Sequence, residues 1–305
     1  YQSLGSQIAV KKIVLPFNGT KPLHLLSNMF FVRALKERVV HITGDTHYAL
    51  LLAYKCKTIL TIHDCTTLER TTGIKHHLLK WLWFSLPVKL ANRVVAISEA
   101  TAHDINKYTG YPIHKIQIIP SFTAKTFPYK ERMLNDELTN VIVFSQSENK
   151  NLNRFIEAVK GLSVHLMIVG KLNEVQGKAL AAYGISFENV SRATEDQLFD
   201  YYQRAQVLLF ASIKEGFGMP IVEAQQQGLP VITSDCSSMP GVAGGGALLV
   251  DPYSVSSIRD GLIQLLSDDK LRTEIISKGR ENAKLYAPET ISKVYLDLYR
   301  ELLAS

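Results

Sequence analysis

Short apolar runs alternate with helical patterns along almost the whole chain, and this alternation constrains the fold more than any other feature of the sequence. Each run has the length of a buried strand, and the segments between the runs have the apolar spacing of helices. Strands separated by helices form parallel sheets that helices cover on both faces. The expected strands lie at residues 8–15, 39–43, 58–62, 94–97, 116–119, 141–144, 165–169, near 190, 207–211 and 231–233.

The alternation lapses once, in a polar and irregular stretch between residues 121 and 138. At 305 residues the chain is long enough for two domains of about 150 residues each. We therefore expect an α/β protein with two Rossmann-like domains in series. The first domain covers residues 1–122, a linker covers 123–138, the second domain covers 139–286, and a final helix covers 287–305.

The stretch with the most chemical content is VLLFASIKEGFGMPIVEAQQQGLPVITSD, residues 207–235. It predicts a strand, a glycine-bearing turn, a helix that begins at Pro220, and a second strand. The helix is expected to carry Glu223 in its first turn and to end at Gly228. Glu215 stands in the turn, so seven residues separate the two carboxylates.

Each part of this stretch suits one part of a ligand. A helix N-terminus offers unpaired N–H groups and a positive dipole end, and glycine lets an anion approach the backbone. Carboxylates accept hydrogen bonds from sugar hydroxyls. A molecule with phosphate in the middle and a sugar at each end fits both features, and a nucleotide-sugar has this shape. An ordinary strand–helix unit with two surface glutamates is the alternative.

From Glu215 to Asp235 the stretch resembles, nearly position by position, the donor motif of the retaining glycosyltransferases of family 4, also called group 1. That family has the GT-B fold, in which two parallel-sheet domains face a central cleft and the C-terminal helix crosses back to the N-terminal domain. Further matches with landmarks of the family extend over both halves of the chain. They are Thr61-Ile62-His63-Asp64, Ala96-Ile97-Ser98-Glu99, Ile118-Ile119-Pro120, Glu148-Asn149-Lys150-Asn151, Ile168-Val169-Gly170, and Ser238-Met239-Pro240 through Leu249-Val250-Asp251-Pro252.

The resemblance implies a role for each matching residue. Glu215 would meet the hydroxyls of the donor sugar, Glu223 would bind the ribose, and Lys150 would hold the diphosphate with the backbone N–H groups near Gly218. His63 would position the donor from the acceptor side. The full set implied by the resemblance has Glu215 and His63 as catalytic residues, and Lys150, Gly170, Phe217, Gly218, Met219, Pro220 and Glu223 as donor-binding residues.

Three of these residues also have plainer interpretations. Lys150 fits an exposed loop lysine, Gly170 fits a turn glycine, and His63 fits a hydrogen-bonded structural histidine at a strand end. His41, Asp45 and His47 have the residue types of a metal site, but their sequence context is a strand end, so we do not expect them to bind a metal. We expect no metal and no cofactor besides the nucleotide-sugar donor, such as a UDP- or GDP-hexose.

The sequence departs from the family in two places. The family's first strand and glycine-rich loop, which help to hold the acceptor and the diphosphate, have no counterpart before residues 8–15, so we expect the N-terminal domain to lack them. The basic residue usual shortly before the Lys-Asn pair is absent as well, and Gln146 stands about there. Lys150 would then carry the phosphate-facing charge alone.

Charge and cysteine content exclude several classes of protein. Net charge is +6, too weak an excess to argue for nucleic acid. Three scattered cysteines predict no disulfide framework and fit a cytoplasmic protein. No apolar run reaches the roughly 18–20 residues of a spanning helix, and no signal peptide is evident.

One segment is basic and aromatic. Between Arg70 and Ser98 there are five basic residues and no acidic residue, and within it residues 73–93 interleave tryptophans and leucines with lysines and histidines. Such a helix can lie on an anionic membrane face, or it can pack in its domain with the lysines in water. Peripheral contact with the inner membrane through 73–93 is the partner surface that the sequence suggests.

Together these features predict a metal-independent, retaining hexosyltransferase that acts on a glycan or lipid-linked acceptor in surface polysaccharide synthesis, such as capsule, O-antigen or lipopolysaccharide. Two alternatives stay open: a nucleotide-sugar-binding protein without activity, and another GT-B enzyme such as an epimerase or a phosphorylase. The sequence gives neither the donor's base and sugar nor the acceptor.

Overall fold

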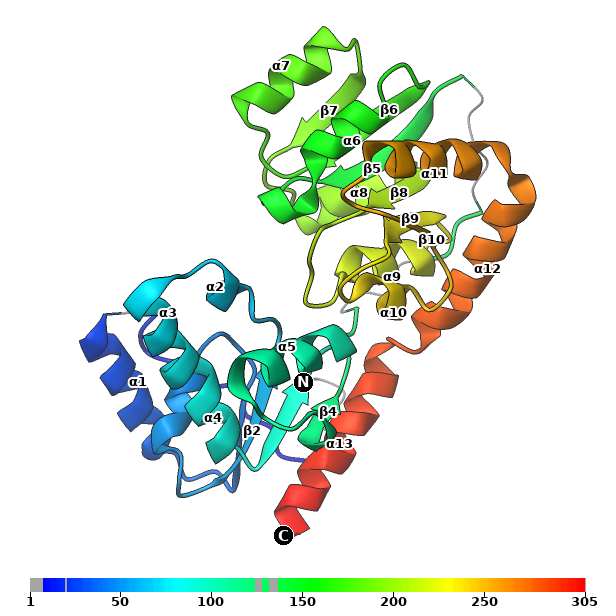
Figure 1. Cartoon of the computed structure of the whole chain (residues 1–305). Coiled ribbons are helices and arrows are strands. Elements are labelled where there is room, and N and C mark those ends of the chain that lie inside the picture. The colour runs from blue at the N-terminus through cyan, green and yellow to red at the C-terminus, as the bar shows by residue number, and fades with distance from the viewer. Residues whose placement is uncertain (1–7, 20, 124–127, 132–136, 305) are drawn as a thin grey trace. The chain divides into compact units, whose positions relative to one another are not determined.

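The computed structural model describes residues 8–19, 21–123, 128–131 and 137–304. The chain divides into two compact units, and each has its own parallel sheet (Figure 1). Unit 1 consists of Tyr1–Phe122 and Pro288–Ser305, and unit 2 consists of Thr123–Ala287. Of the expected linker, residues 124–127 and 132–136 lie outside the described part of the chain.

Unit 1 is built on a four-stranded parallel sheet in the order β1-β2-β3-β4. Its strands are β1 (Val39–Ile42), β2 (Lys57–Ile62), β3 (Arg93–Ala96) and β4 (Ile116–Ile118). Its helical segments are α1 (Pro22–Arg33), η1 (His47–Leu52), α2 (Thr66–Glu69), α3 (Gly73–Leu79), η2 (Lys80–Ser85), α4 (Leu86–Leu90), α5 (Glu99–Thr109), η3 (Ile113–Lys115) and α13 (Pro288–Ala304).

The last helix, α13, belongs to unit 1 although it follows unit 2 in the sequence. Its apolar face, with Ile291, Leu298 and Leu302, packs against Ile59, Val95 and Ile119 of the sheet side. The amphipathic spacing of this helix makes the packing possible, because its apolar residues recur every three or four positions.

Two expectations for unit 1 are wrong. Residues 8–15 form no strand, and β1 is the edge of the described sheet. The chain turns instead toward α1, where the backbone N–H and C=O of Phe17 bond to the buried side chain of Asn28. The helix expected in the basic and aromatic segment 73–93 is three segments, α3, the π-helix η2 and α4. A π-bulge widens the turn and is a known irregularity within long helices.

Two histidines of unit 1 are held inside it as neutral rings. His47 Nδ1 lies 2.9 Å from the backbone oxygen of Trp83, so it donates to that oxygen. His41 is hydrogen-bonded to the hydroxyls of Tyr299 (2.6 Å) and Thr61 (2.7 Å). Burial lowers the pKa of each histidine from 6.5 to about 4, and the nearby His63 adds to the effect. Within the described residues, no group of three or more His, Cys, Asp or Glu side chains is placed to hold a metal ion.

These histidines predict a loss of stability in mild acid. As the pH falls from about 6.5 to about 4, the unfolded chain takes up protons that the folded chain does not bind, so the free energy of unfolding decreases. Each histidine contributes up to about 3 kcal/mol over this window. We expect His41→Gln to flatten the dependence of the melting temperature on pH between 6.5 and 4.5. The exposed His114→Gln serves as the control, and equal slopes in all three proteins would contradict the prediction.

Unit 2 is built on a six-stranded parallel sheet in the order β10-β9-β8-β5-β6-β7. Its strands are β5 (Thr139–Phe144), β6 (Val164–Val169), β7 (Ser186–Val190), β8 (Val207–Phe210), β9 (Val231–Ser234) and β10 (Leu248–Val250). Its helical segments are η4 (Glu148–Lys150), α6 (Leu152–Ala158), α7 (Glu174–Ala182), α8 (Glu195–Arg204), α9 (Met219–Gln226), α10 (Met239–Ala243), α11 (Val255–Ser267) and α12 (Asp269–Lys284).

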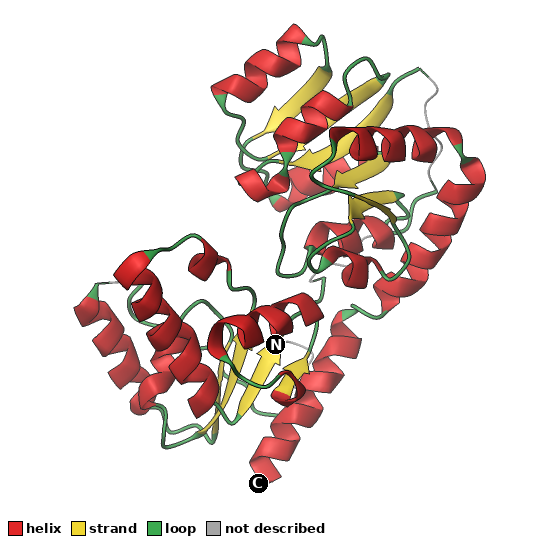
Figure 2. Ribbon diagram, viewed as in Figure 1, coloured by secondary structure: helices red, strands yellow, loops and turns green. Residues whose placement is uncertain are grey.

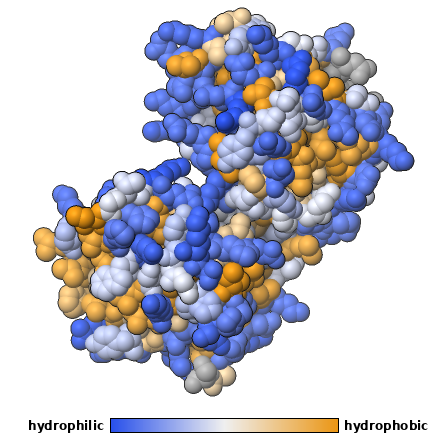
Figure 3. Space-filling view, in the orientation of Figure 1, coloured by the Kyte–Doolittle hydropathy of each residue, from blue (hydrophilic) through white to orange (hydrophobic). Residues whose placement is uncertain are grey.

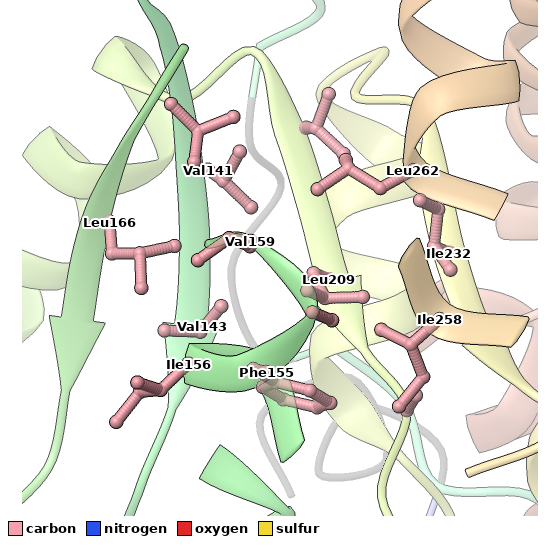
Figure 4. Packing of buried hydrophobic residues seen from close by; sticks show 14 of the residues in the cluster. Val141, Val143, Phe155, Ile156, Val159, Leu166, Leu209, Ile232, Ile258 and Leu262 are labelled. Atoms are coloured by element: carbon pink, nitrogen blue, oxygen red, sulfur yellow. The ribbon is translucent and has the colours of Figure 1, made fainter. Parts of the chain in front are cut away.

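Helices cover the sheet of unit 2 on both faces (Figure 2). Alternate residues of the buried strands point to opposite faces, as the pleat requires. Val141 and Val143 of β5 enter a cluster with Phe155 of α6 and Leu262 of α11 (Figure 4). Phe144 points to the other face, where its ring contacts Tyr202 of α8.

The strand order of unit 2 creates a switch point. Counted from β5 as the first strand, the chain adds β6 and β7 on one side and then β8, β9 and β10 on the other. The loops that follow β5 and β8 therefore leave the sheet in opposite directions at the carboxyl ends of these two strands. Ligands of open α/β sheets bind at such a switch point.

Candidate functional site

The turn between β8 and α9 lies at the switch point of unit 2. Helix α9 begins at Met219, and Gly218 before it has a φ of +105°, a backbone conformation that a side chain rarely adopts. This places Pro220 second in the helix and Glu223 in its second turn. Both differ from the expectation of a helix that starts at the proline, because the glycine turns the chain one residue earlier.

Two serine hydroxyls hold this turn from the next strand. Ser238 Oγ donates to the backbone oxygens of Glu215 (3.1 Å) and Phe217 (2.7 Å). Ser237 Oγ donates to the oxygen of Glu215 (2.9 Å) and accepts from its N–H (3.3 Å). Because both serines follow β9, the neighbouring strand fixes the turn in place.

The predicted catalytic residue of this unit, Glu215, is in direct contact with the predicted donor-binding residue Lys150. Lys150, from the loop after β5, places its Nζ 2.8 Å from Glu215 Oε1, and the two side chains are 16% and 15% exposed. Lys150 Nζ also lies 4.6 Å from the centre of the Phe210 ring. Such a pair, largely removed from water, leaves a costly isolated charge when either member is lost.

Asn149 joins the same contact. Its Nδ2 donates to the backbone oxygen of Lys214 (2.8 Å) and lies 3.4 Å from Glu215 Oε1. The next asparagine, Asn151, has a φ of +66° and donates to the oxygens of Ala211 and Pro252. The loop after β5 is thus tied to the loop after β8 by side chains, so Lys150 is not a free surface lysine.

Glu223 has a different environment. Its Oε2 accepts a hydrogen bond of 2.7 Å from the hydroxyl of the fully buried Tyr202 on α8. Burial raises the pKa of the Glu223 carboxyl, and the Tyr202 bond opposes that rise. The pKa of Tyr202 is raised well above 10 by burial and by the neighbouring carboxylate, so this phenol always donates.

A row of aromatic rings connects the two acids. Tyr202 contacts Phe144, Phe144 contacts Phe210, and Phe210 contacts Lys150. Phe144 and Phe210 are the last residues of β5 and β8. Glu223, through Tyr202, and Glu215, through Lys150, are therefore both linked to the aromatic rings at the carboxyl ends of β5 and β8.

Gly170 lies at the end of β6 with a φ of +125°. A Cβ there would lie 2.7 Å from Ser145 Oγ and 2.9 Å from the backbone nitrogen of Gln146. This glycine is required because the loop after β5 passes against it, which is a stronger constraint than that of an ordinary turn glycine.

The other predicted residues contribute in different ways. The ring of Phe217 is buried edge-to-face on Tyr286, with centroids 5.4 Å apart, so only its backbone faces the turn. Met219 and Pro220 are partly exposed at the start of α9. His63 lies in unit 1 at the end of β2, where its Nε2 is 2.7 Å from the backbone oxygen of Thr43.

Four further residues build the site. The sequence match includes Asn149 and Ser238 but gives them no role, and it includes neither Tyr202 nor Ser237. Asn149 stands beside the predicted Lys150, and the serine pair lies between a strand and a helix. Both positions could therefore have been predicted from the sequence as part of the site. Tyr202 could not, because a tyrosine on an amphipathic helix reads as a core residue.

The fold and this site define a class, the GT-B glycosyltransferases, and comparison with known proteins agrees. Residues 129–282 match the family model "Glycosyl transferases group 1", and residues 4–123 match "Glycosyltransferase Family 4". The chain is 35% identical over 310 residues to the O-antigen chain mannosyltransferase B of Escherichia coli, and the match covers 92% of this chain and 78% of that protein. The chain belongs to glycosyltransferase family 4.

Solved structures with low sequence identity share the fold. Sucrose-phosphate synthase from Thermosynechococcus elongatus superposes with a TM-score of 0.77 at 18% identity, covering 93% of this chain and 78% of that one. Anabaena Alr3699/HepE in complex with UDP and glucose superposes with a TM-score of 0.76 at 15% identity, covering 92% and 82%. At these identities the likeness shows the fold alone.

Proposed function

We propose that the protein is a retaining, metal-independent hexosyltransferase that uses a nucleoside-diphosphate sugar as donor. The contact between Lys150 and Glu215 across the switch point is the observation that carries this proposal. In this proposal Lys150 is the cation for the diphosphate and Glu215 the acid for the sugar, and the start of α9 adds backbone N–H groups. Fixed positive groups at this position stabilise the charge that grows on the leaving diphosphate.

In this proposal the remaining residues divide the donor between them. Glu223 accepts from the ribose, with its second oxygen held by Tyr202. The backbone of Gly218 and Met219 meets the diphosphate, and Gly170 lets the loop after β5 come close. His63 keeps the role that the family resemblance implies, which is to position the donor.

The name of one relative supports a proposal for the acceptor. The Escherichia coli relative is named for its role on the O-antigen chain, so we propose a growing glycan or a lipid-linked sugar of a surface polysaccharide as acceptor. Mannose is the first hexose to test for the same reason. Lipid-linked sugars lie at the membrane, and we place the protein in the cytoplasm with contact to the membrane face through residues 73–93.

The experiment is transfer from a panel of UDP- and GDP-hexoses to mannose-terminated oligosaccharides, followed by mass spectrometry and by proton NMR of the new anomeric centre. The proposal expects one donor to give a product with retained configuration, in the presence of EDTA as well. Nucleotide binding without product would favour an inactive binding protein. An altered free sugar would favour an epimerase, and a need for phosphate would favour a phosphorylase.

Tyr202→Phe tests the role given to Glu223. It removes the hydrogen bond that favours the charged carboxylate, so the pKa of Glu223 rises further. We expect the affinity for the nucleoside diphosphate to fall about threefold to tenfold, as the loss of roughly 1 kcal/mol implies, and the acid limb of its pH profile to move upward. Calorimetric titration between pH 5 and 8 measures both.

Tyr183→Phe is the matched control for this variant, because Tyr183 donates to Glu157 at 2.8 Å in the same unit but away from the switch point. Equal affinities and equal pH profiles for the wild type and Tyr202→Phe would remove Glu223 from the ribose site.

A further inference from the structure

The pair of Lys150 and Glu215 differs from the other ion pairs that the structure describes in unit 2. In the view of Figure 3, hydrophilic residues cover much of this unit. Each of the other pairs described there has at least one side chain that is about a third or more exposed. Lys150 and Glu215 are both largely buried. Because water screens these two charges little, they interact strongly with each other and with any charge brought beside them.

Glu215 is the fixed member of the pair. Ser237 Oγ and Ser238 Oγ both donate to its backbone oxygen from the loop after β9. Asn149 Nδ2 donates at 2.8 Å to the backbone oxygen of the residue just before it. Lys150 carries its ammonium group on a flexible aliphatic stem, and within the described residues the hydrogen-bond acceptor of its Nζ is Glu215 Oε1. The lysine can therefore turn toward a ligand while the carboxylate stays in place.

A nucleoside-diphosphate sugar and the nucleoside diphosphate released after transfer differ at the sugar end. In the proposed function both ligands present the same ribose to Glu223, and both present phosphates to Lys150 and the start of α9. The sugar hydroxyls reach Glu215, and hydroxyls donate to a carboxylate. Among the residues assigned to the donor in unit 2, Glu215 is therefore the one that meets the two ligands differently.

A phosphate that binds Lys150 has an unfavourable consequence for Glu215. A phosphate oxygen and Glu215 Oε1 bound to the same ammonium group would lie within about 6 Å of each other, twice a hydrogen-bond length, and like charges repel strongly where water is scarce. When the lysine turns away to the phosphate, the carboxylate loses its cation. The sugar of the intact donor compensates for this loss by donating hydroxyls to the carboxylate. The released nucleoside diphosphate has no group that does so.

We propose that the Lys150–Glu215 pair makes the site discriminate between the intact donor and the nucleoside diphosphate released after transfer. In the empty site the carboxylate holds the lysine, so any diphosphate has to displace Glu215, which lowers its apparent affinity. A ligand that carries the sugar recovers this loss. The product therefore binds weakly and leaves readily, and product release limits turnover in many enzymes. The discrimination rests on the proposed function, from which the roles of both residues are taken.

The test is calorimetric titration without acceptor, using GDP and GDP-mannose as one pair of ligands and UDP and UDP-glucose as the other. Glu215→Gln removes the charge that holds Lys150 and keeps the shape of the side chain. We expect this variant to bind the nucleoside diphosphate about fivefold to tenfold more tightly than the wild type does. A carboxylate that serves only to bind the sugar would have no effect on a ligand without a sugar.

The sugar nucleotide should show no such gain in Glu215→Gln. The released lysine favours its binding, but the lost charge weakens the hydrogen bonds with the sugar hydroxyls. We therefore expect the preference of the protein for the sugar nucleotide over the nucleoside diphosphate to fall by at least about fivefold.

Two controls separate the pair from a general effect of negative charge. Glu148→Gln removes an exposed carboxylate from the same loop as Lys150, and we expect the affinity for the nucleoside diphosphate to change by less than about twofold. Lys150→Met and Lys150→Met/Glu215→Gln complete a double-mutant cycle. We expect these two proteins to have affinities within about twofold of each other, because without the lysine the carboxylate has nothing to withhold.

Unchanged or weaker binding of the nucleoside diphosphate by Glu215→Gln would overturn the proposed discrimination. An equal gain in Glu148→Gln, or a gain that persists without Lys150, would overturn it as well. Thermal melts check that each variant folds. Should Glu215→Gln not fold, Glu215→Asp draws the charge back by one methylene, and we expect a smaller gain in affinity, whose absence would overturn the discrimination.

The outcomes also separate this discrimination from the proposed function. Transfer by the wild type with no gain in Glu215→Gln refutes only the discrimination. A gain in Glu215→Gln with no transfer by the wild type refutes only the enzyme. Failure of the wild type to bind any of the four ligands refutes both.

Discussion

Glu215→Gln is expected to lower kcat for sugar transfer by about 100-fold to 1,000-fold, while the chain still folds. The change keeps the shape of the side chain but removes the charge that faces Lys150 and accepts from the donor sugar. Loss of one fixed electrostatic partner at a reacting centre commonly costs a factor of about 100 to 1,000. Initial rates at saturating donor and acceptor measure the effect.

The same variant should lose some stability, because Lys150 is left without its partner in a place that is 16% exposed. The expected decrease in the free energy of unfolding is about 1–3 kcal/mol, between the values for surface pairs and fully buried pairs. Glu188→Gln is the control, since it breaks an ion pair with Arg204 whose side chains are more exposed. Wild-type turnover in Glu215→Gln would refute the assignment of the site.

Lys150→Met is the second large effect that we expect. It removes the cation assigned to the diphosphate, and kcat/KM should fall by about 100-fold to 1,000-fold. Affinity for a nucleoside diphosphate should fall with it, whereas affinity for the nucleoside without phosphate should not change. Calorimetric titration with both ligands separates the two, and Lys178→Met, which breaks an exposed ion pair with Glu174, is the control.

The double variant Lys150→Met/Glu215→Gln separates structure from chemistry. If the pair serves stability alone, removing both charges relieves the isolated charge and restores both stability and transfer. If the pair serves the reaction, stability recovers and transfer does not. We expect the second result, and recovery of transfer in the double variant would contradict the role given to both residues.

Much of the fold was predictable because its parts are local. The strands of both sheets are short apolar runs bounded by polar residues, and β5, β6, β8 and β9 lie where the pattern predicts them. The turn at Glu215 was predictable for a similar reason, since glycines and a proline fix the backbone within a few residues. The exact start of α9 was not, because the conformation of Gly218 determines it.

The features that could not be predicted depend on contacts between distant segments. Residues 8–15 have the composition of a strand, but a strand needs a neighbouring strand to pair with. Just after this segment, the backbone of Phe17 is hydrogen-bonded to the side chain of Asn28 instead. The support of Glu223 by Tyr202 joins α9 to α8 across 21 positions of sequence.

A crystal of the chain soaked with a nucleoside diphosphate tests the central claim most directly. The account predicts that the phosphates lie against the backbone N–H groups at Gly218 and Met219 and within reach of Lys150 Nζ, with the ribose hydroxyls on the Glu223 carboxylate. An ordered nucleotide bound away from the loops after β5 and β8, with Lys150 still paired to Glu215 and remote from any phosphate, would contradict it.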